Sequence, residues 1–225
     1  MYGRNHTDEN AYIDKEISVI KGSAIIEAAY RNNLSCLEML LNANGSVDAK
    51  DIPTQRTALR YSISKENFEA IQLLLDHGSN IEARDINGYT ALMAASVNGQ
   101  LNVSRFLVKK KANPYVIIHG IGDSILHQIM EKNANDGQIP ENMTKTFDYI
   151  LNQNNSFFLE HANFEGHTPY LYACYKGLQT IMNYLEEKGT AIHATDNNGK
   201  TCAKLCHGYE AKRVTEEIGC LPIKG

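Results

Sequence analysis

The chain has 225 residues, of which 43% are hydrophobic and 21% are charged, a balance typical of a folded protein rather than a disordered one. Its 22 Lys and Arg against 26 Asp and Glu give a net charge of −4, which argues against a surface that binds nucleic acid throughout. No apolar run approaches the roughly 18 residues that cross a bilayer, and residues 1–10 lack the apolar core of a signal peptide. We therefore expect a cytoplasmic chain without membrane insertion.

The N-terminal region, residues 1–22, is predicted to form a loose arm and a capping helix. Ile13, Ile17 and Ile20 fall at i, i+4 and i+7, the spacing that gathers side chains on one face of a helix. Such a helix would cover the first apolar face of the structure that follows.

A hydroxyl residue then recurs at a nearly constant interval. The intervals are 34, 33, 34, 44 and 33 residues, and a fixed period of this length is the mark of a repeat protein. Each occurrence precedes a similar apolar cluster, so the whole unit repeats. The six positions are Ser23, Thr57, Thr90, Ser124, Thr168 and Thr201.

Each repeat is predicted to consist of a turn and two short helices. Gly88 suits a tight turn with positive φ, and Thr90 supplies a hydroxyl that can cap the helix after it. Ile71 and Leu74 share one helical face, and Gly78 stands where a left-handed residue would end that helix.

The sequence of residues 85–95, DINGYTALMAA, resembles the ankyrin repeat, and related versions start at 163 and 196. The resemblance implies an all-α ankyrin-repeat solenoid, made of stacked helix-turn-helix pairs with projecting β-hairpin loops. It implies about five repeats and an incomplete C-terminal capping unit within residues 23–218, followed by a frayed tail at 219–225. Single repeats of this kind cannot bury their own apolar faces, so neighbours must stack.

The long interval, between Ser124 and Thr168, predicts an insertion at about 131–143 in the fourth repeat. Residues 131–138 are polar and turn-rich, which favours a loop between the two helices of that repeat. The loop is either a tolerated surface insertion or a contact element for a second surface.

The cysteines include the strongest candidate ligands for a metal ion. Cys202, Cys206 and His207, with His193 and Cys220 nearby in the sequence, could hold zinc. The spacing lacks a C-x₂-C pair, however, and a buried free cysteine serves as a small apolar side chain. The five cysteines, which include Cys36 and Cys174, are odd in number and dispersed, so we expect reduced thiols, no metal and no cofactor.

No catalytic residues are expected. The chain contains no phosphate-binding glycine loop, no G-x-S-x-G and no H-E-x-x-H. Cys174 and His167 could pair as nucleophile and base, but the repeat pattern points Cys174 inward, where packing explains it better.

A partner is expected on the loop tips and on the exposed positions of the inner helices, which the resemblance makes the recognition surface. Aromatic residues and arginine dominate binding energy at such surfaces, although aromatic residues also fill gaps between neighbouring loops. The basic members favour a partner with an acidic or phosphorylated segment. The predicted contact residues are Tyr30, Arg31, Arg56, Lys65, Arg84, Ile86, Tyr89, Phe164, His167, Tyr175, Lys176 and Lys200.

The resemblance implies a non-catalytic module, expected to be monomeric, that binds another protein. One alternative is a bacterial or viral effector that binds a host protein in the host cytosol. A second is an enzyme or zinc protein that uses the C-terminal Cys/His cluster. A third, direct binding of nucleic acid, would show a steep salt dependence.

Overall fold

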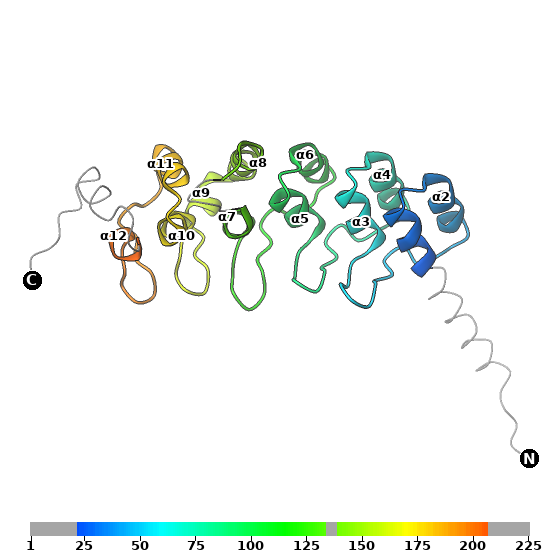
Figure 1. The fold of residues 1–225 in the computed structure, drawn as a ribbon, viewed down its shortest axis with the longest axis horizontal. Helices are drawn as coiled ribbons and strands as arrows, with labels where there is room; N and C mark the ends of the chain where they lie inside the picture. The colour runs from blue at the N-terminus through cyan, green and yellow to red at the C-terminus, as the bar shows by residue number, and fades with distance from the viewer. Residues whose placement is uncertain (1–21, 134–138, 207–225) are drawn as a thin grey trace, which may run out of the picture. The chain divides into compact units, whose positions relative to one another are not determined.

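The computed structural model describes residues 22–133 and 139–206 (Figure 1). Within this part every regular element is a helix and no strand occurs. The predicted N-terminal arm, the centre of the predicted insertion and the C-terminal tail lie outside the described residues. Residues 22–30 are helical, and the later helices are α2 (Leu34–Asn42), α3 (Ala58–Ser64), α4 (Phe68–Asp76), α5 (Ala91–Val97), α6 (Leu101–Lys109), α7 (Ile125–Asn133), α8 (Glu141–Leu151), α9 (Asn155–Glu160), α10 (Pro169–Lys176), α11 (Gln179–Glu187) and α12 (Cys202–Leu205).

The chain divides into two compact units. Among the described residues, the N-terminal unit holds 22–95 and 105–112, and the C-terminal unit holds 96–104, 113–133 and 139–206. In the N-terminal unit α3 packs on α4 and α2 packs on α4; in the C-terminal unit α10 contacts α7, α9, α11 and α12. Consecutive helices thus form pairs, and the predicted all-α repeat fold is confirmed.

The inner helices start at the residues that the period identified. The side chain of Thr57 accepts a hydrogen bond from the backbone N–H of Arg60, and Thr168 does the same for Leu171. Asn67 caps the outer helix α4 by accepting from the N–H of Ala70. These contacts satisfy N–H groups that have no partner inside the helix.

The loops between repeats are tight turns rather than paired strands. In the loop before α5, the N–H of Asp85 donates to the carbonyl of Tyr89 at 3.0 Å, and Gly88 has a φ of 80°. The Asp85 carboxylate accepts from the N–H groups of Asn87 and Tyr89. Asn163 and Asp196 build the same turn in the later loops.

Neighbouring loops inside each unit are joined by a single backbone hydrogen bond. Ile86 donates to the carbonyl of Thr54 in the N-terminal unit, and Phe164 donates to the carbonyl of Ile121 in the C-terminal unit, both at 2.9 Å. This contact fixes the spacing of successive loop tips, and so it positions the side chains that the tips carry.

The fourth repeat differs from the others in its helices. α8 spans 11 residues where α4, α6 and α11 each span 9, and the additional helix α9 occupies a segment that is a turn in other repeats. Phe158 of α9 is fully buried, so α9 contributes to the core of the C-terminal unit.

Candidate partner-binding surface

The structure separates the twelve predicted contact residues by burial. Tyr89 and His167 are buried, with exposed fractions of 9% and 4%, so the expectation that Tyr89 lies exposed at a loop tip is wrong. Tyr89 directly precedes Thr90, whose hydroxyl accepts from the N–H of Met93, and Tyr89 interacts electrostatically with Arg60. Arg56, Arg84 and Lys176 are half-buried, and the exposed residues are Tyr30, Arg31, Lys65, Ile86, Phe164, Tyr175 and Lys200.

The basic residues of the N-terminal unit are largely engaged within it. The Nε atoms of Arg60 and Arg56 lie 3.8 and 3.9 Å from the buried carboxylate of Asp85. Burial lowers the pKa of Arg60, an effect that Arg56 reinforces and Asp85 opposes. Arg84 donates from Nη1 to the carbonyl of Gly88 at 2.9 Å. Arg56 and Arg84 were predicted to contact a partner. In the structure both instead contact the loop that contains Asp85 and Gly88 and help to stabilise it.

Tyr30, one of the exposed aromatic residues of this unit, also has a packing role. The ring of Tyr30 meets that of Tyr61 edge-on at 5.6 Å, and the ammonium of Lys65 lies 5.2 Å above the Tyr30 ring. Arg31 pairs with Glu27 one helical turn earlier. Tyr30 thus fits the alternative in which aromatic residues fill gaps between repeats.

The C-terminal unit contains a hollow of about 440 Å³ between two loops and two helices. Gly120 and Ile121 come from one loop, the next loop supplies residues 163–165, and α7 and α10 provide the floor. We call this site the C-terminal hollow, and its lining consists of Gly120, Ile121, Asp123, Gln128, Glu131, Asn163, Phe164, Glu165, Tyr172, Tyr175 and Lys176.

The charged floor of the C-terminal hollow is centred on Glu131. Its Oε2 atom lies 2.5 Å from Nζ of Lys176 and accepts a hydrogen bond from the hydroxyl of Tyr172 at 2.5 Å. Partial burial pushes the pKa of Glu131 upward, but the hydrogen bonds from Lys176 and Tyr172 outweigh it and lower that pKa. The pKa of the Tyr172 hydroxyl is raised, mainly by burial and to a smaller extent by the hydrogen bond to Glu131. Glu131 is therefore held ionised between two donors.

A second polar group holds the loops of the hollow in place. The Asp123 carboxylate accepts from the side-chain amides of Gln128 at 2.7 Å and of Asn163 at 2.8 Å. Asn163 in turn accepts from the N–H groups of Glu165 and His167 through its own side chain. The buried polar groups thus satisfy one another and fix the loops.

The rim of the hollow is apolar and exposed. Phe164, Tyr175 and Ile121 have exposed fractions of 62%, 49% and 46%. The ring of Tyr175 stacks on the buried ring of His167, with the ring centroids 5.4 Å apart. This contact helps to fix the orientation of the Tyr175 ring. Gly122, with a φ of 76°, leaves the space that the Phe164 ring occupies, since a Cβ there would come within 2.5 Å of that ring.

The structure thus groups Phe164, Tyr175 and Lys176 at one site, with His167 beneath them. Ile121 and Tyr172 belong to the same site but were not among the predicted residues. Ile121 lies three residues before Ser124, and the predicted residues Ile86 and Phe164 lie four residues before Thr90 and Thr168. The repeat pattern therefore places Ile121 in an equivalent loop. The role of Tyr172 could be recognised only from its contact with Glu131.

The comparisons with known proteins agree with this architecture. Residues 25–117 match the family model described as ankyrin repeats, with three copies. Residues 25–117 therefore carry ankyrin repeats. The predicted resemblance to this family is confirmed, and the described helix pairs extend the same pattern beyond residue 117.

This ankyrin-repeat chain is also similar to a chain in a solved complex. The complex contains a predatory endopeptidase from Bdellovibrio bacteriovorus and an immunity protein, and the similarity has a TM-score of 0.65 with 26% identity. It covers 81% of this chain and 90% of the other. No curated protein matches the sequence significantly.

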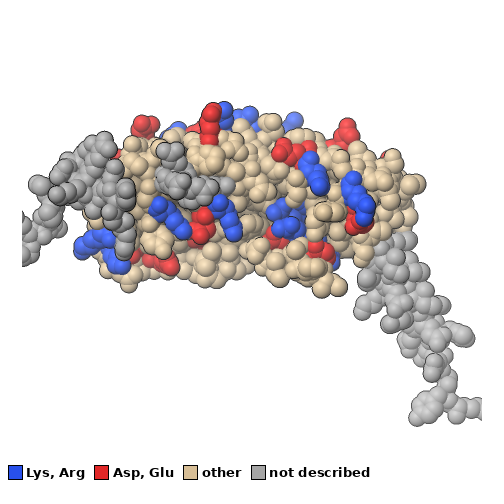
Figure 2. Space-filling model, viewed as in Figure 1, with Lys and Arg blue, Asp and Glu red and all other residues tan. Residues whose placement is uncertain are grey.

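Charged residues of both signs are mixed on one face of the molecule. On the face that Figure 2 shows, many Lys and Arg side chains lie next to Asp or Glu rather than in one basic stripe. Among the described helices, none is long and apolar enough to cross a bilayer.

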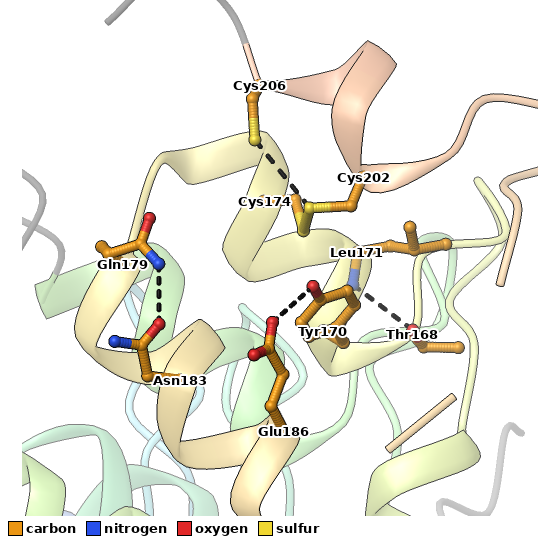
Figure 3. Close-up of a disulfide and its surroundings, with 9 residues drawn as sticks. All are labelled: Thr168, Tyr170, Leu171, Cys174, Gln179, Asn183, Glu186, Cys202 and Cys206. Atoms are coloured by element: carbon orange, nitrogen blue, oxygen red, sulfur yellow. Dashed lines mark hydrogen bonds between the residues drawn. A yellow bond between two sulfur atoms is a disulfide. The ribbon is translucent and has the colours of Figure 1, made fainter. Parts of the chain in front are cut away.

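The cysteines of the ankyrin chain differ from the prediction. Cys174 of α10 and Cys202 of α12 form a disulfide with their Cα atoms 5.4 Å apart, so the expectation of only reduced thiols is wrong (Figure 3). Stacking of α12 on α10 brings these residues together although 28 positions separate them. Cys36 and Cys206 are free thiols. His193 is exposed, and His207 and Cys220 lie outside the described residues.

Proposed function

We propose that this ankyrin-repeat protein is a non-catalytic binding module that holds another protein at the C-terminal hollow. The observation that carries the proposal is the exposure of Phe164, Tyr175 and Ile121 around one concavity. Exposed aromatic side chains that surround a hollow are typical of the energetic centre of a protein interface.

The rigidity of the hollow supports the same function. Its floor is held by the contacts of Glu131 with Lys176 and Tyr172, and its loops are held by Asp123 and Asn163. A surface that is already ordered loses little conformational entropy when a partner binds. The similarity to a chain from a complex between two proteins is consistent with a binding role.

The charge of the hollow suggests the chemistry of the partner. Three carboxylates, those of Asp123, Glu131 and Glu165, line it, against the single ammonium of Lys176. We therefore propose a partner segment with an apolar side chain that contacts the aromatic rim and a basic residue that reaches the carboxylates lining the hollow. An acidic or phosphorylated segment, as the sequence predicted, would fit this site less well and would have to contact the exposed Lys65 or Lys200 elsewhere.

The experiment that tests the proposal is site-specific photo-crosslinking in cells that produce the protein. A photo-reactive phenylalanine analogue replaces Phe164 in one variant and Ile52 in another. Ile52 is 90% exposed and lies in the N-terminal unit, so it is a matched control for a surface apolar residue. We expect a discrete crosslinked protein from position 164 that is missing from position 52. Equal labelling from both positions, or none from position 164, would contradict the proposal.

A further inference from the structure

Three cysteine side chains converge at the end of the C-terminal unit. Cys174 comes from α10, and Cys202 and Cys206 come from α12 and its C-terminal cap. Their three Sγ atoms all lie within 4.8 Å of one another, and those of Cys202 and Cys206 are 3.9 Å apart. Figure 3 shows the side chains pointing toward a common centre.

We propose that these three cysteines, once the Cys174–Cys202 disulfide is reduced, bind one Zn²⁺ ion. This property goes beyond partner binding and does not depend on it. Thiolates are the ligands that zinc prefers among soft donors. At a Zn–S distance of about 2.3 Å, two sulfur ligands of a tetrahedral ion lie about 3.8 Å apart. The Sγ atoms of Cys202 and Cys206 already have this separation.

The backbone presents the thiols in a fixed arrangement. Cys202 and Cys206 are four residues apart, and the N–H of Cys206 donates to the carbonyl of Cys202 at 3.0 Å, so one helical turn places both sulfur atoms on the same side. Cys174 faces them from α10, which packs on α12. Two neighbouring elements thus supply the ligands.

The burial of the three cysteines indicates from which side a fourth ligand could reach a bound zinc ion. Cys174 is fully buried and Cys202 is 5% exposed, whereas Cys206 is half-buried. Three protein ligands leave one position of a tetrahedral zinc ion free, and a water molecule can occupy it on the side of Cys206. The same burial raises the pKa of the Cys206 thiol, so the metal must displace its proton.

The chemistry balances with a low-molecular-weight thiol as reductant. Two thiol molecules each give one hydrogen atom to the Cys174–Cys202 bond, which yields two cysteine thiols and one oxidised disulfide of the reductant. The three protein thiols then release three protons as they bind Zn²⁺, so the complex carries one negative charge. Disulfide and zinc site are therefore alternative states of one cluster.

Cobalt titration of the reduced, metal-free protein tests the proposal. A phosphine reductant opens the disulfide without competing as a thiol ligand, and Co²⁺ reports thiolate binding by sulfur-to-metal charge-transfer absorption. We expect one Co²⁺ per chain, displaced by one Zn²⁺, and no binding while the disulfide is intact. Absence of the charge-transfer band in the reduced wild-type protein would overturn the proposal.

Matched variants assign the ligands. Cys206→Ser should weaken cobalt binding by at least tenfold, whereas Cys36→Ser, which removes a thiol of the N-terminal unit, should leave it unchanged. Circular dichroism confirms that each variant is folded. If Cys206→Ser binds Co²⁺ as tightly as the wild type, or if Cys36→Ser loses binding to the same extent, the three-cysteine site is wrong. In the wild type, Zn²⁺ should also slow alkylation of exactly three thiols by at least tenfold.

Discussion

The Nε2 atom of His127 lies 2.9 Å from the backbone carbonyl oxygen of His167. Its Nδ1 atom accepts from the N–H of Ser124 at 3.3 Å and contacts the Ser124 hydroxyl at 2.8 Å. The ring is therefore neutral, with its proton on Nε2, and it ties α7 to the loop of the next repeat. The same loop carries Phe164, so His127 helps to position the rim of the C-terminal hollow.

This contact predicts a loss of stability in mild acid. Burial lowers the pKa of His127 from 6.5 to about 4. Between these values the unfolded chain binds a proton at His127 that the folded chain does not. The contribution of neutral His127 to the free energy of unfolding is therefore fully present above pH 6.5 and falls as the pH approaches 4. The loss from this residue is about 3 kcal/mol at most.

Urea unfolding of the wild type and of His127→Gln across this range measures the effect. Gln can still donate to the carbonyl of His167 but does not titrate. We expect a weaker pH dependence above pH 4 in the variant. The pKa values of Asp51, Glu131 and Asp148 are lowered in the folded state. The stabilisation from these ionised carboxylates is therefore lost mainly below about pH 4. Identical pH profiles for the two proteins would show that His127 does not carry the effect.

The sequence predicted the repeat because its signals are local. Thr57 and Thr168 cap helices, Gly88 has a positive φ, and Ile71 and Leu74 are fully buried, as their spacing indicates. Each of these properties depends on a few neighbouring residues. The sequence pattern of one repeat is therefore enough to predict them, and the period of about 33 residues shows where each repeat begins.

The features that sequence analysis missed depend on contacts between repeats. Tyr89 is buried and interacts electrostatically with Arg60 of the neighbouring helix α3. The hydroxyl of Tyr172 donates to Glu131, which lies 41 residues earlier in the sequence. Cys174 meets Cys202 only because α12 stacks on α10. The site could therefore be predicted as a region of loop tips but not residue by residue.

Gly122 and Gly120 form a natural pair for testing how Phe164 is positioned. Both have a positive φ, 76° and 89°, but a Cβ at Gly122 would clash with the Phe164 ring and one at Gly120 would meet nothing within 4 Å. Both changes to Ala should cost about 1 kcal/mol through the backbone. Gly122→Ala should cost at least about 1 kcal/mol more, since the ring must move. Chemical denaturation of both variants measures the difference, and equal values would mean that Phe164 does not need the space.

The contact between Tyr172 and Glu131 should stabilise the C-terminal unit modestly. Tyr172→Phe removes the hydroxyl donor, and we expect a loss of about 1 kcal/mol in the free energy of unfolding. A double-mutant cycle with Glu131→Ala, which removes the acceptor, isolates the pair from other effects of each change. A coupling energy near zero would show that the hydrogen bond contributes no net stability.

The disulfide should stabilise the metal-free protein. A bond between residues 28 positions apart is worth about 3 to 4 kcal/mol by restricting the unfolded chain. Reduction should therefore lower the melting temperature of the oxidised protein, and Cys174→Ser should do the same without reductant. Cys36→Ser serves as the control and should respond to reduction as the wild type does. A melting temperature that reduction leaves unchanged would argue against a stabilising disulfide.

The most direct test of the C-terminal hollow as the binding surface uses the partner identified by crosslinking. Its affinity is measured for three purified variants. Phe164→Ala and Tyr175→Ala should each weaken binding by about 1 to 3 kcal/mol, roughly 5- to 150-fold in Kd. Ile52→Ala, an equally simple surface truncation in the N-terminal unit, should leave Kd unchanged. Unaltered affinity in both hollow variants, measured by calorimetry on folded protein, would contradict the account.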